Sequence, residues 1–187
     1  LESKGVTFVT DSDTEVLLNL FSIYKEKCLE FLNGMFAFAV LDNSNGELFI
    51  ARDRIGIKPL YYHSRENFFA FASDLKSFLV CKNISKNISQ DAILQFLYFD
   101  YVPQPKTIYD NIYKLLPGHY IKIQGRRKII IKKYWDIDLN NKISDGPNII
   151  NDFRELFKDS VRIRQKADVK YGAFLSGGMD SSAVIAN

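Results

Sequence analysis

The apolar positions of this chain change period near residue 35, from a helical spacing to short alternating runs. Between residues 13 and 33, apolar side chains recur at mostly helical spacing, which is typical of one buried helix face. Ser12 and Glu15 open this stretch as a capping box, in which each side chain can satisfy a free N–H group of the first turn. The pattern therefore predicts a helix over residues 13–33.

After residue 35, apolar runs alternate with turn residues, a pattern that indicates antiparallel strands. Apolar side chains occupy both faces of the first strand, so we expect helices above and below the sheet. Two hairpins are predicted, from residues 35–41 with 47–52 and from residues 58–63 with 68–73 around a turn at 64–67. Short helices are predicted at residues 73–80 and 89–99, and a second pair of strands at 120–123 and 129–131.

A polar stretch at residues 140–148, which contains Gly146-Pro147, divides the chain. Beyond it, residues 149–165 carry the apolar face of a helix, and residues 169–175 form an apolar run that predicts a buried strand. A glycine-rich loop and the start of another helix follow this strand. We therefore predict a first domain at residues 1–139, a linker at 140–148, and a second domain with a parallel sheet that begins at 149 and runs to 187.

The composition excludes several classes of protein. Of the 187 residues, 47% are apolar, which is enough for one large or two small domains. The net charge of +3 is small, and the one basic run, Arg126-Arg127-Lys128, is interpreted as a solvated hairpin, so no nucleic-acid partner is predicted. These residues contain no signal peptide and no long apolar span, so no membrane partner is predicted.

The cysteines and the chain ends add two expectations. Two cysteines and two histidines do not make a convincing zinc cluster, and the unpaired cysteines fit a reducing, cytoplasmic location. The chain starts at Leu1 and stops at Asn187 inside a predicted helix. We therefore interpret it as a fragment with sequence missing at both ends.

The densest group of chemically useful residues lies in the loop before the last helix, Phe174-Leu175-Ser176-Gly177-Gly178-Met179-Asp180-Ser181-Ser182. Adjacent glycines let a ligand approach the backbone, and the following helix start offers free N–H groups to an anion. Ser181 and Ser182 can add hydroxyl donors, and Asp180 can hold a hydrated magnesium ion. Two alternatives stay open: an ordinary turn with a serine cap, and a serine hydrolase with Ser176 as nucleophile.

The seven residues from Ser176 to Ser182 resemble the pyrophosphate loop of the ATP pyrophosphatase family. Members of that family cleave ATP between its α- and β-phosphates and adenylate a carboxyl or carbonyl oxygen. The resemblance implies an ATP site, with Asp180 as the magnesium ligand. The ATP-binding residues that it implies are Phe174, Leu175, Ser176, Gly177, Gly178, Asp180, Ser181 and Ser182, with Phe174 or Leu175 on the adenine side.

Residues 33–42 and 51–62 resemble the class II glutamine amidotransferase domain. The resemblance implies an N-terminal-nucleophile hydrolase, an αββα sandwich of antiparallel sheets, and it matches Asp13 to the acid that pairs with the α-ammonium group of glutamine. The nucleophile of that family is an N-terminal cysteine. Cys28 falls within a predicted helix and Cys81 after one, so neither takes this role and no catalytic residue is assigned.

The residues Arg52, Asp53 and Gly56 within this resemblance have a structural interpretation. A charge pair that braces a turn, with a glycine that allows the bend, explains each residue type. His63 and His119 are predicted at a strand end and in a turn, without partners that would indicate catalysis. The resemblance likewise implies that this segment supports the glutamine pocket and does not react.

An amidotransferase domain followed by a pyrophosphate loop is the order found in glutamine-hydrolysing asparagine synthetases, which this chain resembles over nearly its whole length. The resemblance implies the substrates glutamine, aspartate and ATP, and a β-aspartyl-AMP, formed with Mg²⁺, that ammonia from glutamine attacks. A homodimer is left open, and the 187 residues alone are expected to have neither activity.

Two other functions remain open. One is a related synthetase, such as a β-lactam synthetase or an enzyme that amidates another carboxylate. The other is a non-catalytic nucleotide-binding homologue. In each case the fold class is α/β: a partial αββα sandwich, followed by the start of a parallel-sheet domain like that of the adenine-nucleotide α-hydrolases.

Overall fold

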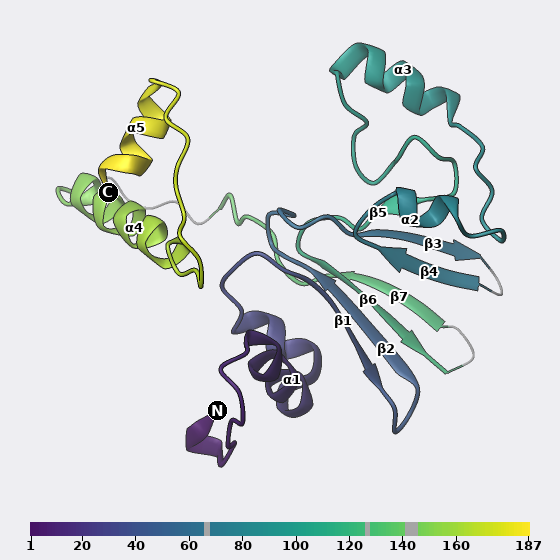
Figure 1. Cartoon of the computed structure of the whole chain (residues 1–187), viewed down its shortest axis with the longest axis horizontal. Coiled ribbons are helices and arrows are strands. Elements are labelled where there is room, and N and C mark those ends of the chain that lie inside the picture. The colour runs from purple at the N-terminus through teal and green to yellow at the C-terminus, as the bar shows by residue number, and fades with distance from the viewer. Residues whose placement is uncertain (66–67, 126–127, 141–145) are drawn as a thin grey trace. The chain divides into compact units, whose positions relative to one another are not determined.

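The computed structural model describes residues 1–187 except 66–67, 126–127 and 141–145, and it contains two compact units (Figure 1). The first unit is Leu1–Ile137 and the second is Asp138–Asn187. The predicted turn at residues 64–67, the basic run at residues 126–128 and the linker at residues 140–148 each fall partly outside the described residues.

Short helices and seven strands make up the described part of the first unit. Its helices are η1 (Glu2–Lys4), α1 (Asp13–Tyr24), η2 (Lys25–Glu30), α2 (Lys76–Leu79) and α3 (Gln90–Phe99), of which η1 and η2 are 3₁₀-helices. Its strands are β1 (Ala37–Asp42), β2 (Glu47–Arg52), β3 (Tyr61–Arg65), β4 (Phe68–Ala72), β5 (Tyr113–Lys114), β6 (His119–Gln124) and β7 (Lys128–Lys133). The second unit contains α4 (Ile149–Arg164) and α5 (Met179–Ala186). The predicted hairpins and the helices predicted from residues 73, 89 and 149 are confirmed, with ends that differ by a few residues.

The two predicted hairpins lie in different sheets. β1 and β2 join β6 and β7 in a four-stranded antiparallel sheet of order β1-β2-β6-β7. β3 and β4 join β5 in a three-stranded antiparallel sheet of order β4-β3-β5. The sequence pattern indicated a single sheet, because a hairpin is specified locally whereas its next neighbour comes from far along the chain.

Alternating side chains of the strands fill three successive cores. On one face of β2, Phe49 packs with Phe21 of α1 and Leu29 of η2; on the other face, Ile50 packs with Leu60 and other residues between the two sheets. Beyond the second sheet, the buried Phe78, Ile84 and Ile112 pack against Phe68, Ala70 and other residues of its outer face. The layers therefore run from helices α1 and η2 through two sheets to α2, which confirms the αββα sandwich (Figure 1).

The helix predicted over residues 13–33 is interrupted at Lys25. Lys25 has φ +51°, which ends α1, and the chain continues as the 3₁₀-helix η2. The Nζ atom of Lys25 lies 3.2 Å from the Oδ2 atom of Asp42, the last residue of β1. The position holds neither glycine nor proline, so the sequence carries no local signal for this break.

The strand predicted at residues 169–175 is not formed. These residues have no regular secondary structure and pair with no strand in the described part of the second unit. Their apolar side chains are exposed, including Val169, Tyr171 and Phe174. A strand needs a neighbour to bond its backbone, and the described residues of this unit supply only two helices, so the parallel sheet that we expected is absent from them.

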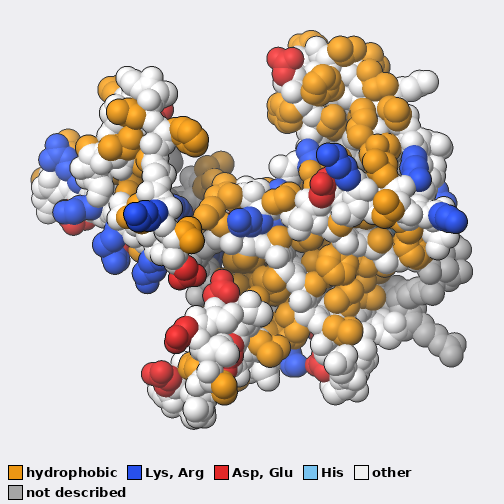
Figure 2. All heavy atoms as spheres, viewed as in Figure 1, with side chains coloured by type: hydrophobic (Ala, Val, Ile, Leu, Met, Phe, Trp, Pro, Cys, Tyr) orange, Lys and Arg blue, Asp and Glu red, His pale blue; other side chains and the backbone are white. Residues whose placement is uncertain are grey.

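Helix α3 is fixed at both ends by local contacts and leaves most of its apolar side chains exposed. Ser89 caps it by accepting a hydrogen bond from the Ala92 N–H at 3.4 Å, and Asp100 ends it with φ +61°. Leu97 and Tyr98 are 73% and 82% exposed, and Figure 2 shows apolar atoms gathered over this helix. No helix in the described chain is both long and apolar enough to cross a membrane.

Asp53 holds the turn that follows β2 through its carboxylate. Its Oδ1 accepts hydrogen bonds from the N–H groups of Ile55 at 3.2 Å and Ile57 at 2.9 Å, and its Oδ2 accepts one from Lys58 at 2.9 Å. Burial favours the neutral acid, but the N–H groups of Lys58 and Ile57 outweigh it and lower the pKa of Asp53. The residue is 1% exposed, so this turn is anchored to the core.

Arg52 binds the same turn from the other side. Its guanidinium donates to the carbonyl oxygens of Lys58 at 2.7 Å and Gly56 at 2.6 Å, and to the Gln104 side chain at 2.9 Å. The bracing role is confirmed, and Gly56 adopts φ +73° as the bend requires. The predicted charge pair is not formed: no Arg52–Asp53 ion pair occurs in the described residues. Asp53 bonds to backbone N–H groups, and Arg52 bonds to backbone carbonyls and to Gln104.

Gly118 joins this turn to the start of β6. Its N–H donates to the carbonyl of Asp53 at 2.9 Å, and its carbonyl accepts from the N–H of Tyr134 at 2.8 Å. Its φ is +65°, and a Cβ atom there would lie 2.5 Å from the carbonyl oxygen of Trp135. Only glycine fits this conformation and this close approach of two backbones.

We expect Asp53→Asn to lower the free energy of unfolding by about 2–4 kcal/mol at neutral pH, because an amide cannot accept all three hydrogen bonds. Since the folded-state pKa of Asp53 is lowered, its stabilisation is present above the unfolded pKa of about 4 and is lost as pH falls through the folded pKa. Urea unfolding followed by the single tryptophan, Trp135, should show the two proteins converging at acidic pH. A difference that stays constant down to about pH 2 would contradict this role.

We expect Gly118→Ala to cost about 3 kcal/mol or more, and Gly46→Ala only about 1 kcal/mol. Both glycines have positive φ, at +65° and +70°, but a Cβ at Gly46 meets no atom within 4 Å. The pair therefore separates backbone strain from the clash with Trp135. Equal shifts of the urea midpoint would show that the clash is relieved at little cost.

Candidate functional site

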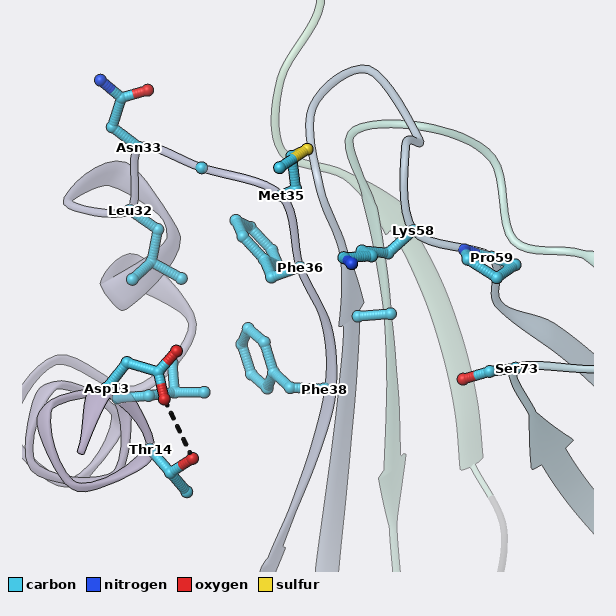
Figure 3. Close-up of a pocket in the computed structure, with 13 residues that line it drawn as sticks. Asp13, Thr14, Leu32, Asn33, Met35, Phe36, Phe38, Lys58, Pro59 and Ser73 are labelled. Carbon is cyan, nitrogen blue, oxygen red and sulfur yellow. Dashed lines mark hydrogen bonds between the residues drawn. The ribbon is translucent and has the colours of Figure 1, made fainter. Parts of the chain in front are cut away.

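The first unit contains a pocket of about 570 Å³ between the start of α1 and the beginning of β1. Three other segments complete its wall: the chain before β1, the turn after β2, and the residue after β4 (Figure 3). Its polar side chains are Asp13, Thr14, Asn33, Lys58 and Ser73. Its apolar side chains are Leu17, Leu32, Met35, Phe36, Ala37, Phe38 and Pro59. A pocket with a few polar groups on an apolar wall suits a small polar ligand.

Asp13 is the first residue of α1 and lines this pocket. The Thr14 hydroxyl donates to its Oδ1 at 3.3 Å, the contact drawn in Figure 3. Ser12 caps the helix by accepting from the Thr14 N–H at 3.2 Å. The carboxylate therefore lies at a fixed helix start, where it can meet a cationic group of a ligand.

The predicted capping box forms only in part. Ser12 accepts from the N–H of Thr14 and not from that of Glu15. Glu15 does not return to the N–H of Ser12; its carboxylate instead accepts from the N–H groups of Val9 at 2.9 Å and Thr10 at 2.7 Å. Glu15 thus binds the loop before the helix.

The opposite wall comes from β1 and from the turn that Arg52 and Asp53 hold. Phe36 and Phe38 pack against the core cluster next to α1, and their rings are 5.5 Å apart. The N–H of Asp53 donates to the carbonyl of Phe36 at 2.8 Å. Lys58 is exposed and presents an amine to the pocket across from Asp13 (Figure 3). The pocket therefore has an acid and a base on different elements.

The sequence singled out only Asp13 of these pocket residues. Lys58 and Phe36 lie in the segments that carried the family resemblance, but nothing in their spacing placed them in one pocket. Ser73 comes directly after β4 and was predicted only as a strand end and a helix start. A contact between distant segments leaves no local pattern, so these residues were missed.

The cysteines and histidines lie elsewhere. Cys28 is fully buried in the core, and burial, with a smaller effect of Glu26, raises the pKa of its thiol to about 11, so it is a poor nucleophile. Cys81 packs against the outer core of the second sheet. The Nδ1 atom of the buried His63 is 2.6 Å from the carbonyl of Asn111, and that of His119 is 2.7 Å from Pro117. His63 was predicted at a strand end but lies in the middle of β3, and His119 was predicted in a turn but is the first residue of β6.

The second unit carries the glycine-rich loop at the start of α5. Gly178 is the N-cap residue, and no side chain caps the helix. Gly177 adopts φ +80°, so the chain turns where the sequence predicted a turn. Ser181 and Ser182 donate their hydroxyl groups to the Gly178 carbonyl at 3.1 and 2.8 Å, and the Oγ atoms of Ser181 and Ser176 are 3.0 Å apart. Three hydroxyl groups thus gather beside an uncapped helix start.

The other loop residues are exposed. Phe174 and Leu175 precede the loop with side chains open to solvent, and Asp180 lies in the first turn of α5. In the described residues, no group of three His, Cys, Asp or Glu side chains could hold a metal ion. The alternative prediction, an ordinary turn with a serine cap, is wrong, because the N-cap residue of α5 is Gly178.

Two protein families match the chain, one after the other. The glutamine amidotransferase domain matches residues 1–135, and asparagine synthase matches residues 152–187. Asparagine synthetase [glutamine-hydrolyzing] 1 of Bacillus subtilis is 39% identical over 185 residues, which cover 99% of this chain and 29% of that protein. Putative asparagine synthetase [glutamine-hydrolyzing] 2 of Methanocaldococcus jannaschii is 39% identical over 179 residues, or 94% of this chain and 35% of that protein.

A solved structure shows the same fold. The structure of an allosteric regulatory enzyme of purine biosynthesis has a TM-score of 0.50 and 18% identity to this chain, and the match covers 98% of this chain and 37% of that one. The chain spans about a third of the length of the two asparagine synthetases. It belongs to the glutamine amidotransferase domain family, and it continues into a segment of the asparagine synthase family.

Proposed function

We propose that this chain is part of a glutamine-dependent asparagine synthetase, which converts aspartate to asparagine with ATP and with ammonia from glutamine. One observation carries the proposal: a pocket of about 570 Å³ with an acid in its wall, in an amidotransferase fold, is followed in the same chain by a loop suited to phosphate. We assign residues 1–139 to the amidotransferase domain, 140–148 to a linker, and 149–187 to the opening of the ATP-binding domain.

Glutamine would bind in the pocket of the first unit. Its α-ammonium group needs an anion, and the carboxylate of Asp13 is the acid in the wall. The methylene groups of glutamine would lie along the apolar wall that includes Phe36 and Phe38. We assign no nucleophile to the residues of this chain, because neither Cys28 nor Cys81 lines the pocket.

ATP would bind at the glycine-rich loop of the second unit. The uncapped helix start offers N–H groups, and the hydroxyls of Ser176, Ser181 and Ser182 lie beside it. Gly177 and Gly178 let the phosphates approach the backbone. Phe174 or Leu175, both exposed, would contact the adenine ring. These donors would stabilise the negative charge of the departing pyrophosphate.

A magnesium ion fits the same loop through Asp180. A carboxylate in the first turn of a helix repels phosphate unless a cation lies between them. Mg²⁺ in nucleotide sites takes one or two carboxylates and completes its shell with phosphate oxygens and water. Asp180 would supply the carboxylate, and the ion would neutralise charge on the phosphates.

The acceptor is proposed to be aspartate, which is adenylated to β-aspartyl-AMP before ammonia attacks. The described pocket and loop contain no group that distinguishes aspartate from another carboxylate. A related synthetase is therefore the second candidate, and the product formed with aspartate distinguishes the two. A non-catalytic homologue would bind ATP without aspartate-dependent release of pyrophosphate.

The remaining partners follow from this function. The substrates are small molecules, and we propose a cytoplasmic location, without a nucleic-acid or membrane partner. A homodimer is proposed on the resemblance alone, and sedimentation of the complete gene product tests it.

Asp13→Asn in the complete gene product should raise the KM for glutamine by about 100-fold, because a charge-assisted hydrogen bond to the α-ammonium group is lost. Asparagine formation supplied with ammonia bypasses the pocket and should keep its rate. Steady-state assays with each nitrogen donor measure both. An unchanged KM for glutamine would remove Asp13 from the site.

Asp180→Ala should lower aspartate-dependent pyrophosphate release by about 100-fold or more, because the magnesium ion loses its protein carboxylate. Glutamine hydrolysis should remain. Asp168→Ala removes an exposed acid of the same unit that lies before the loop, and it serves as the matched control. Equal losses in the two variants would rule out a specific role for Asp180.

A further inference from the structure

We propose that Glu15 is a positioning residue for the glutamine pocket, because it fixes the loop before α1 and thereby the place of Asp13. The inference rests on the proposed function, in which Asp13 binds the α-ammonium group of glutamine. Glu15 is not itself among the residues that line the pocket. Its effect on the ligand would therefore pass through the chain that precedes the helix.

From Val9 to the start of α1, the loop lacks apolar anchoring. All the side chains from Val9 to Thr14 are exposed, and Val9 is 88% exposed. Burial therefore contributes little to holding this segment, and hydrogen bonds must hold it instead. Asp13 directly follows this segment, so any motion of the loop would also change the position of the Asp13 carboxylate.

The carboxylate of Glu15 supplies most of these hydrogen bonds. Its Oε1 accepts from the Val9 N–H at 2.9 Å, and its Oε2 accepts from the Thr10 N–H at 2.7 Å and from the Thr10 hydroxyl at 2.5 Å. These hydrogen bonds lower the pKa of Glu15: the Thr10 hydroxyl has the largest effect, and the N–H groups of Val9 and Thr10 have smaller ones. Both oxygens are thus used, and the group stays charged at neutral pH.

A chain of hydrogen bonds connects this carboxylate to Asp13. The Ser12 N–H donates to the Thr10 hydroxyl oxygen at 3.3 Å, and Ser12 Oγ accepts from the Thr14 N–H at 3.2 Å. The Thr14 hydroxyl then donates to Asp13 Oδ1 at 3.3 Å. The connection runs from Glu15 through Thr10, Ser12 and Thr14 to Asp13, so the cap and the pocket acid are held by one network.

Glu15→Gln tests this role in the complete gene product. The amide keeps the size of the side chain but presents an NH₂ group to donors of the loop. We expect the KM for glutamine to rise by about tenfold, the effect of one weakened charge-assisted contact, with kcat changed by less than about twofold. A merely structural loss would lower the amount of folded enzyme and hence kcat, and would leave KM unchanged.

Three further variants make the result decisive. Thr10→Val removes the hydroxyl from the middle of the network and should raise KM in the same direction, which covers the case in which Glu15→Gln fails to fold. Asp11→Asn removes a neighbouring exposed acid and should leave the KM for glutamine within about twofold. The proposed effect of Glu15 comes from its hydrogen bonds to the loop, and the charge of an exposed acid is screened by solvent. Asp13→Asn reports on the site itself.

The outcomes separate the inference from the function on which it rests. A KM raised by Asp13→Asn but unchanged by Glu15→Gln and Thr10→Val would overturn the inference and leave the glutamine site intact. Equal increases from Glu15→Gln and Asp11→Asn would also overturn it, in favour of a general effect of charge. No effect of Asp13→Asn would overturn the glutamine site, and with it the inference.

Discussion

The architecture of the first unit depends on the bonds made by one buried residue, Asp53. Its carboxylate accepts hydrogen bonds from three backbone N–H groups of the turn after β2. Its own N–H reaches the carbonyl of Phe36, and its carbonyl accepts from Gly118 at the entrance to β6. Three segments that are far apart in sequence therefore meet at a single residue. Since one of them is a wall of the pocket and another carries Lys58, the shape of the pocket follows from this meeting.

The two sites are built on different physical principles. The pocket is made by packed elements, in which Phe36 and Phe38 belong to the core next to α1 and the turn is tied to buried groups. The loop at Ser176–Ser182 is made locally, by two glycines, three hydroxyls and a helix start. A pocket of the first kind is stable only as part of a fold, whereas a loop of the second kind takes its conformation from its own sequence. In the proposed enzyme, this suits selection of an amino acid at one site and binding of phosphate at the other.

This difference explains how much the sequence could predict. The hairpins, α3, α4 and the turn at Gly177 were predictable, because period and turn chemistry act over a few residues. The αββα class and Asp13 came from the resemblance, and the structure places Asp13 in a pocket. The division into two sheets, the break at Lys25 and the contribution of Lys58 were not predictable, because each depends on contacts between distant segments. The strand expected at residues 169–175 failed for the same reason, since its pattern is local but its partners are not.

The segment at residues 169–175 has a practical consequence for work with the protein. Val169, Tyr171 and Phe174 stand exposed on a backbone that bonds to no strand in the described residues. Segments of this kind enter protease active sites readily, and they pair with one another in concentrated solution. In these 187 residues, limited digestion should therefore cut within this segment, and it should leave the first unit and α4 in one piece. Ile137, where that unit ends, is therefore a sensible boundary for expressing the amidotransferase part at high concentration, because a chain that stops there leaves the exposed segment out.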